Sequence, residues 1–499
     1  RFMSQIRKLA SQTAYYGISS ILGRVLNFAL VPFYTRILPE EEYGVVIHLY
    51  GIAAFLNIIY TYGLETSFFR FTTKNKSIDA YHYTATAILF TSILFSGFIY
   101  FDAASLANFT AATEHPEYLQ YLAVIVFIDA IVSIPFAKLR LDDRPIKFAL
   151  IRLTVIAVTI GLNLLFLLAF PAIANGEYLS ILQPWVQKVY NPELGVGYIF
   201  IANLIANSLY IPMLFKELAQ IRIRFKWSAF KPILAYSFPI FLMGLAAMFN
   251  DQGYTILFNF LFDDPEKELG VYGSAFKLSV LMMLGIQAFR YAGEPFFFSH
   301  AENKEAPSLF AKVMHYFVVF NIAIMVAIAV NIELIADVFL GRPGYKAALY
   351  VLPVLLIGKL FFGVYVNLSV WFKIKDKTIY GTYFTAIGAL ITLVGHLWLV
   401  RIPSIGYFGS AISALVCYAV MCALCYYKGR KVFPVPYNFK KLFLYLIIAV
   451  GVIYGSNLIS ISNAWGQYGI DIFVTVVFFV AIYLLEGRGF KYKTVEKRQ

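Results

Sequence analysis

The sequence predicts an all-α polytopic membrane protein with about fourteen transmembrane helices: two parallel six-helix repeats, an N-lobe and a C-lobe, plus two extra C-terminal helices. Three observations support this prediction. Apolar residues make up 60% of the chain and charged residues only 14%. Stretches of membrane-spanning length with little or no charge recur from Gln12 to Glu486. Motifs in the first half of the chain recur in the same order in the second half.

The individual spans are predicted from apolar length, because about 20 residues cross the hydrocarbon core as a helix. A soluble protein of this composition would need a larger core than one domain normally builds. Met3 is the expected natural start, with Arg1 and Phe2 as remnants of handling, and no cleavable signal peptide is expected. The spans are expected at 12–36, 43–66, 80–101, 118–138, 148–170, 195–215, 232–260, 269–292, 310–332, 347–372, 378–400, 407–427, 441–460 and 468–486.

The loops between the spans predict how the chain is oriented. Lysine and arginine gather in loops on one side of the predicted membrane, at 70–76, 138–147, 222–231, 373–377 and 428–441, and in the tail. The alternate loops hold few basic residues and lean acidic, as at 40–42 and 263–266. Basic loops are expected to be cytoplasmic, which makes both termini cytoplasmic. The net charge of +13 therefore reflects topology, and no nucleic acid partner is expected.

The chain lacks the motifs of an enzyme or a nucleotide hydrolase. It contains no phosphate-binding loop of the G-x-x-x-x-G-K-[ST] kind, so neither ATP hydrolysis nor a cofactor is expected. Cys417, Cys422 and Cys425 fall in one predicted span, where packed thiols are favoured over a zinc or redox pair. The longest outer loop, about 171–196, is too short for an enzyme domain.

An internal repeat divides the chain. Glu42-Tyr43-Gly44 after the first span matches Glu268-Leu269-Gly270 after the seventh. His115-Pro116-Glu117-Tyr118 before the fourth span matches Arg342-Pro343-Gly344-Tyr345 before the tenth, at nearly the same spacing. Because each half crosses the membrane an even number of times, both enter from the same side, and two such bundles create a cleft between them. The expected division is an N-lobe at 3–217, a cytoplasmic linker at 218–231, a C-lobe at 232–428, spans thirteen and fourteen at 441–486, and a basic tail at 487–499.

The candidate site consists of five ionisable residues in predicted spans. Arg24, Asp129, Lys277 and Lys359 sit well inside their spans, and Asp251 lies nearer the outer end of its helix. A charge at the bilayer centre costs about 2.5–3.5 kcal/mol or more, so such residues usually face a bundle interior or a water-filled cavity. A guanidinium can clamp a phosphate with two hydrogen bonds, which makes Arg24 the strongest candidate for substrate binding, with Lys277 and Lys359 as further candidates.

Each of these residues also has a purely structural interpretation. Arg24 could be the buried partner of Asp129 or Asp251, and Lys359 could pair with Asp129 across the two halves. Lys277 could extend its side chain to the outer surface instead of lining a cavity. Asp129 and Asp251 could carry a coupling proton or cation, or could serve only in structural ion pairs.

Several short motifs carry a family resemblance, at 9–17, 35–44, 63–66 with Arg70-Phe71, 236–239, 272–277 and 339–353. They resemble motifs of bacterial polysaccharide-lipid flippases of the Wzx type, which belong to the multidrug/oligosaccharidyl-lipid/polysaccharide (MOP) exporter superfamily. The resemblance covers nearly the whole chain, and Arg24 matches a basic position in the first span of that group. Where relatives often have Asp-Arg near the end of span seven, this chain has Asp251-Gln252, so no role is transferred there.

The resemblance implies a flippase that moves a polyprenyl-pyrophosphate-linked oligosaccharide from the cytoplasmic to the outer leaflet of the bacterial inner membrane. It implies two six-helix lobes that alternate between inward-open and outward-open states without ATP hydrolysis. The implied partners are the lipid-linked oligosaccharide, the bilayer and other glycan-assembly proteins.

Two alternatives remain open from the sequence. A cation-coupled drug or metabolite antiporter of the same fold would depend on the acidic residues, and Arg24 would be a liability in it. A membrane-embedded glycosyltransferase or polymerase is disfavoured by the short loops and by the absence of a carboxylate or histidine cluster on any one loop.

Overall fold

The computed structural model describes residues 28–73, 79–301, 303–375 and 377–495, together with Leu22 and Val25. Within these ranges all regular structure is helical, as the sequence predicts. Most of the predicted first span lies outside the described residues, and α2 (Val31–Ile37) is its described end. The three cysteines are buried free thiols in one helix.

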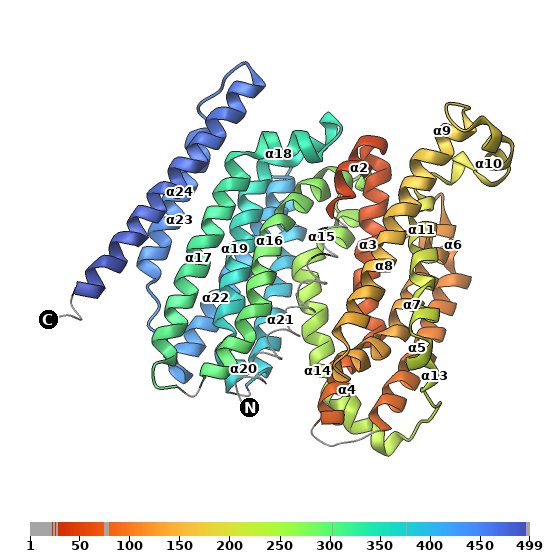
Figure 1. Ribbon diagram of the computed structural model, residues 1–499, viewed down its shortest axis with the longest axis horizontal. Coiled ribbons are helices and arrows are strands. Elements are labelled where there is room, and N and C mark those ends of the chain that lie inside the picture. Colours follow the sequence, from red (N-terminus) through yellow and green to blue (C-terminus); the bar gives the residue numbers. More distant parts are fainter. Residues whose placement is uncertain are drawn as a thin grey trace.

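Helices α2 to α13 form a first bundle, at the right of Figure 1. Its central helix is α7, which packs against α3, α5 and α11. After α2, its elements are α3 (Glu40–Thr61), α4 (Leu64–Thr73), α5 (Asp79–Phe101), α6 (Ala103–Ala107), α7 (Pro116–Leu141), α8 (Pro145–Leu164), η1 (Leu165–Ala169), α9 (Phe170–Ala174), η2 (Ser180–Leu182), α10 (Gln183–Val189), η3 (Pro192–Leu194), α11 (Gly197–Ser208), α12 (Tyr210–Met213) and α13 (Phe215–Ala219).

Helices α14 to α22 form a second bundle beside the first. In it α19 packs against α16, α17 and α22, and α14 packs against α21. Its members are α14 (Trp227–Gln252), α15 (Tyr254–Leu257), η4 (Phe258–Phe260), α16 (Pro265–His300), α17 (Ala306–Val330), α18 (Ile332–Phe339), η5 (Pro343–Val351), α19 (Leu352–Leu368), α20 (Val370–Ile374), α21 (Ile379–Gly395), η6 (His396–Val400) and α22 (Tyr407–Val432).

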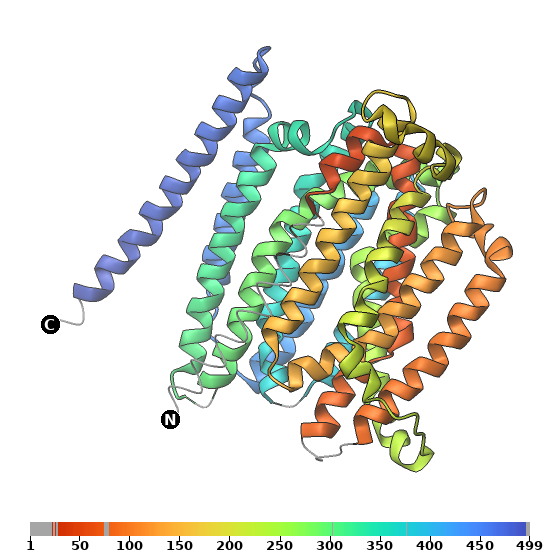
Figure 2. The ribbon, with the colours of Figure 1, turned by 45° about the vertical axis from the view of Figure 1, so that its right-hand side comes forward.

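The last two helices, α23 (Phe439–Ser456) and α24 (Ala464–Val495), lie outside the two bundles and contact the second bundle through α17. Figure 2 shows them at the edge of the molecule farthest from the first bundle. The structure thus agrees with the prediction of two extra C-terminal helices. The exact division into two lobes and a linker stays a prediction.

Helix length and composition make this a multi-pass membrane protein. In the described part of the chain, 12 helices are long and apolar enough to cross a membrane, and Gly197–Met213 is a shorter apolar helix at the place of the sixth predicted span. These helices correspond to thirteen of the fourteen predicted spans, and the first span lies mostly outside the described residues.

The two ends of the molecule differ in the number of basic residues in their loops, as the sequence predicts. Figure 1 shows α4, α13 and α20 at one end and α9, α10 and α18 at the other. We call the former the basic end, because the loops rich in lysine and arginine lie there.

The starts of several helices are encoded locally. Proline occupies the first turn of α7, α8 and α16, where its missing N–H has no helical partner to lose. The Asp264 side chain accepts a hydrogen bond from the Lys267 N–H at the start of α16, and Asn438 caps α23 in the same way through Lys441. These local signals set where the helices begin, including α7 and α16, which carry Asp129 and Lys277.

Candidate functional site

A cavity of about 680 Å³ lies between the two bundles. Helices α2, α3, α8 and α11 of the first bundle line it, and α14, α15, α16, α19, α21 and α22 of the second bundle complete its wall. Asp251, Lys277 and Lys359 are among the lining residues, so three of the five predicted site residues share one space. Arg24, the strongest candidate from the sequence, lies outside the described residues, and its role stays a prediction.

Lys359 and Asp251 form an ion pair in the cavity wall. The Lys359 Nζ lies 2.5 Å from Asp251 Oδ1, and the Gln252 side-chain amide donates to Asp251 Oδ2 at 3.2 Å. The same ammonium lies 4.4 Å from the centroid of the Phe276 ring. Only 5% of the Lys359 side chain is exposed against 29% for Asp251, so the carboxylate, an amide and an aromatic face together stabilise a nearly buried cation.

Lys277 on α16 presents the second cation of the cavity. Among the residues that the structure describes, no carboxylate lies within ion-pair distance of its ammonium. The side chain lines the cavity, in agreement with one of the two interpretations from the sequence. An unpaired cation in a partly buried space favours an anion, because a charge away from bulk water is costly without a counter-charge.

Asp129 is separate from this site. It does not line the cavity, and the Asn207 side-chain amide donates to its Oδ1 at 3.0 Å inside the first bundle. Arg152 lies near enough for its charge to act on this carboxylate, and its guanidinium stacks 4.4 Å from the Phe136 ring centroid. The predicted pairing of Asp129 with Lys359 is therefore wrong in this structure: Lys359 pairs with Asp251, because α14 and α19 bring those two side chains together within one bundle.

The rest of the cavity wall is uncharged and mixes aliphatic, aromatic and polar side chains. The amides of Asn203, Asn250, Gln252 and Gln287 supply donors and acceptors. The tyrosines that line it are Tyr34, Tyr43, Tyr50, Tyr254, Tyr365 and Tyr418.

Sequence reasoning missed these lining tyrosines. Tyr60 and Tyr62 are not among the lining residues, and Tyr15 and Tyr16 lie outside the described residues. A usable signal was the spacing of Tyr43 and Tyr50, which are seven residues apart and so lie on one face of α3.

The two bundles meet closely at the end opposite the basic end. Thr35 Oγ1 donates to the Phe339 carbonyl at 2.8 Å, and an Arg36 guanidinium nitrogen donates to the Val338 carbonyl at 2.8 Å. From the second bundle, the Tyr345 hydroxyl donates a hydrogen bond to the Leu38 carbonyl at 2.9 Å. We call this contact between residues 35–51 and residues 255–273 with 338–345 the seal.

Glycines allow the backbones to approach in the seal. A Cβ on Gly44 would lie 1.7 Å from the Glu266 carbonyl oxygen, and one on Gly270 would lie 1.9 Å from the Glu40 carbonyl oxygen. Gly44 and Gly270 are the equivalent glycines of the two repeat motifs. The repeated motif therefore packs against its own counterpart across the interface between the bundles.

At the basic end the bundles touch through α4 and α14. Ser67 Oγ donates to the Ile233 carbonyl at 3.3 Å, and the Arg70 guanidinium lies 4.1 Å from the Tyr236 ring centroid. Gly63 takes a positive φ of 76°, and a Cβ there would lie 2.7 Å from the Ser237 carbonyl oxygen. The cavity thus lies between two interfaces, of which the seal has the more extensive hydrogen bonding.

Comparison with known proteins identifies the sequence family and the fold. The family model described as polysaccharide biosynthesis protein matches residues 33–343. No curated protein sequence matches the chain.

Solved structures of similar fold are membrane transport proteins. The lipid II flippase MurJ in an inward closed conformation is 12% identical with a TM-score of 0.72, over 95% of this chain and 99% of that one. An inward-facing multidrug resistance MATE family transporter of the MOP superfamily is 14% identical with a TM-score of 0.64, over 82% and 94%. A Vibrio cholerae MATE transporter in the bent form is 14% identical with a TM-score of 0.55, over 88% and 98%. At these identities the likeness concerns the fold alone.

Proposed function

Because this chain belongs to the polysaccharide biosynthesis protein family, we propose that it is a flippase for a polyprenyl-pyrophosphate-linked oligosaccharide, acting by alternating access without ATP hydrolysis. Its place would be the bacterial inner membrane, with both termini in the cytoplasm and transport toward the outer leaflet. Substrate contacts are assigned to Lys277 and Lys359, and to Arg24 outside the described residues.

The observation that carries this proposal is the unpaired ammonium of Lys277 in a wide cavity between the bundles. A lipid-linked oligosaccharide has a pyrophosphate and many hydroxyls. Each bare hydroxyl costs roughly 2–7 kcal/mol in hydrocarbon, so the head needs a polar path while the polyprenyl tail stays in lipid. The amides and tyrosine hydroxyls of the cavity offer hydrogen bonds to sugars, and the cation offers a counter-charge to phosphate.

Transport on this proposal requires the two interfaces to open in turn. The head would enter from the basic end, and the seal would part to release it on the other side. Outward movement of an uncompensated anion is favoured by about 2.3 kcal/mol per charge per 100 mV when the cell interior is negative. Collapse of the membrane potential is therefore expected to slow flipping unless ion coupling at Asp129 or Asp251 replaces it.

The test is flipping of a fluorescent polyprenyl-pyrophosphate oligosaccharide in proteoliposomes by the Lys277→Gln variant. A hydrogen bond to a charged group contributes about 1.5–3 kcal/mol, so the rate is expected to fall about tenfold or more. Lys188→Gln is the matched control, since Lys188 lies exposed on α10, outside both the cavity and the seal. Equal rates for wild type and Lys277→Gln would overturn the proposal.

A cation-coupled drug or metabolite antiporter of the same fold remains the second candidate, and the carboxylate of Asp251 in the cavity wall favours it. In that case drug export would require Asp251, at matched amounts of folded protein, and would tolerate Lys277→Gln. Glycan flipping that requires Lys277 would decide against it.

A further inference from the structure

The segment that joins the two bundles carries an unusual pattern of charge and aromatic residues. Residues 221–226 connect α13 and α14 without helical structure, in the sequence Ile-Arg-Ile-Arg-Phe-Lys before Trp227, and Lys226 has extended backbone angles. Basic and apolar residues alternate there, and alternate residues of an extended chain point to opposite sides. We call residues 215–231 the junction segment.

The apolar residues of the junction segment are exposed. Phe215, Ile223, Phe225 and Trp227 are each more than half exposed. The segment lies between the apolar helix that ends at Met213 and the span that begins at Trp227, so it sits where two helices leave the membrane. Aromatic side chains with basic neighbours at this depth are typical of the headgroup region.

Four of its five basic residues lack a counter-charge among the described residues. The ion pairs of this region use Arg144, Lys147 and Arg224. Lys216, Arg222, Lys226 and Lys231 are exposed, and none has a carboxylate partner in the part of the chain that the structure describes. Four cations are thus free to bind anions outside the protein.

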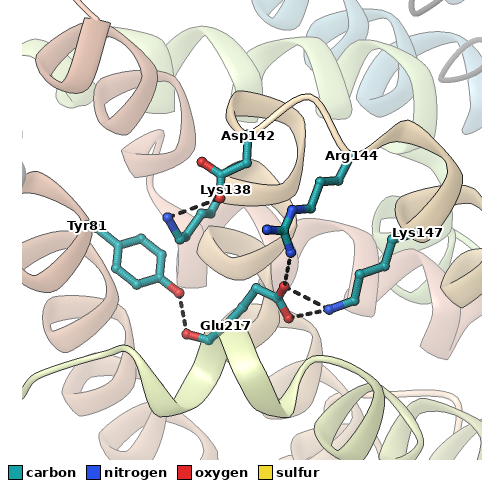
Figure 3. Close-up of polar contacts among 6 residues, drawn as sticks. All are labelled: Tyr81, Lys138, Asp142, Arg144, Lys147 and Glu217. Carbon is teal, nitrogen blue, oxygen red and sulfur yellow. Dashed lines mark hydrogen bonds and ion pairs between the residues drawn. The ribbon is translucent and has the colours of Figure 1, made fainter.

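The junction segment is held in place from both sides. Figure 3 shows Glu217 of α13, which is only 3% exposed, beneath the turn between α7 and α8. Both of its carboxylate oxygens lie 2.7 Å from the Lys147 ammonium, and its backbone carbonyl accepts a hydrogen bond from the Tyr81 hydroxyl at 2.7 Å.

The extended part is fixed to α5 through its backbone. The Arg222 N–H donates to His82 Nδ1 at 3.2 Å, and the Arg224 N–H donates to Thr86 Oγ1 at 3.3 Å. A fixed backbone keeps the exposed side chains in a constant arrangement, which lowers the entropy cost of binding.

We propose that the junction segment is a binding site for the headgroups of anionic phospholipids in the leaflet at the basic end. Arg222, Lys226 and Lys231 bind the phosphates, while Phe225 and Trp227 insert beside the acyl chains. Basic clusters next to transmembrane helices bind anionic lipid in this way. The site is independent of the cavity, so it holds whether or not the proposed substrate is correct.

The test counts lipids on the full chain, purified in detergent, by native mass spectrometry with phosphatidylglycerol or phosphatidylcholine of equal chain lengths. Each basic residue near a membrane surface contributes about a fivefold preference for anionic lipid. The wild type is expected to prefer phosphatidylglycerol at least about tenfold, and the triple variant Arg222→Gln, Lys226→Gln, Lys231→Gln is expected to lose most of this preference.

The matched control removes three charges from the same end of the second bundle: Lys428→Gln, Arg430→Gln and Lys431→Gln. It is expected to keep the preference. Equal binding of the two lipids by the wild type would overturn the proposal. So would a control that loses its preference for phosphatidylglycerol as much as the triple variant does, because that result would indicate a diffuse basic surface.

A second measurement needs no charge variant that might fold poorly. Fluorescence of Trp227, taken as the difference between wild type and Trp227→Phe, is expected to be quenched more by brominated phosphatidylglycerol than by brominated phosphatidylcholine. High salt is expected to remove the difference, since screening weakens exposed charge pairs. Equal quenching by both lipids at low salt would contradict the proposal.

Discussion

At the residue scale, the charges of the cavity wall play different parts. Lys359 and Asp251 neutralise each other, while Lys277 faces the same space with no carboxylate beside it among the described residues. The cavity therefore carries a net positive charge from its described lining. An incoming phosphate would meet Lys277 without first displacing a protein carboxylate.

The ion pair predicts an asymmetry between its two single variants. Asp251→Asn leaves the nearly buried Lys359 ammonium without a counter-charge and is expected to lower stability by about 3 kcal/mol. Lys359→Met leaves a carboxylate that is 29% exposed to the cavity and can be hydrated there, so a smaller loss is expected. Thermal unfolding in detergent measures both.

The double variant Asp251→Asn, Lys359→Met is the control for that pair. It removes both charges and is expected to recover most of the stability lost in Asp251→Asn. A double variant as unstable as the sum of the two single variants would show that the residues do not interact.

At the element scale, the seal depends on the close approach of α3 and α16. Because a Cβ on Gly270 would lie 1.9 Å from a backbone oxygen, Gly270→Ala is expected to push the bundles apart at this end. Spin labels can be attached at Glu41→Cys and Lys267→Cys after the three buried cysteines are replaced by alanine. Electron paramagnetic resonance is then expected to give a longer distance between the two labels in Gly270→Ala than in the same protein with Gly270.

Gly97→Ala in α5 is the matched control, since a Cβ there meets nothing within 4 Å. It is expected to leave the label distances unchanged. If Gly270→Ala gives the same distances as the control, then backbone contact does not hold the seal.

The anchoring of α13 gives a second prediction at this scale. Glu217→Gln removes the charge that Lys147 and Arg144 share, at a cost of about 1–3 kcal/mol for the buried group. The short helix is then held less firmly, and trypsin is expected to cut faster at the basic residues 222–226. Gel analysis of limited digests measures the rate.

Asp142→Asn is the control for Glu217→Gln. Asp142 pairs with Lys138 at 3.1 Å, one helical turn away at a part-exposed surface (Figure 3). Such pairs contribute only about 0.3–0.5 kcal/mol, so the digestion rate is expected to stay as in the wild type. Equal acceleration in both variants would contradict the anchoring role of Glu217.

At the scale of the whole molecule, the sequence predicts the helices well because apolar length is a local property. The segments at 80–101, 118–138 and 407–427 correspond to α5, α7 and α22 within a few residues. The repeat motifs at Gly44 and Gly270 are also visible in the sequence. Their direct contact is not, since sequence matching says nothing about which copies meet.

The site is only partly predictable for the same reason. Span depth identifies Lys277, Lys359 and Asp251 as buried charges, and all three line the cavity. The partner of Lys359 depends on how α14 and α19 are rotated, which packing decides, and the sequence therefore suggests Asp129 instead of Asp251. The rotation of α7 likewise turns Asp129 toward Asn207, inside the first bundle.

Transport by alternating access requires the seal to open during each cycle. A disulfide between Glu40→Cys and Gly344→Cys tests this most directly. A Cβ on Gly344 would lie 3.3 Å from Glu40 Cγ, and a cysteine at residue 40 would place its sulfur near the position of that Cγ. In proteoliposomes, oxidation is expected to stop flipping of the fluorescent polyprenyl-pyrophosphate oligosaccharide, and reduction is expected to restore it. Flipping at the full rate with the disulfide formed would contradict the account.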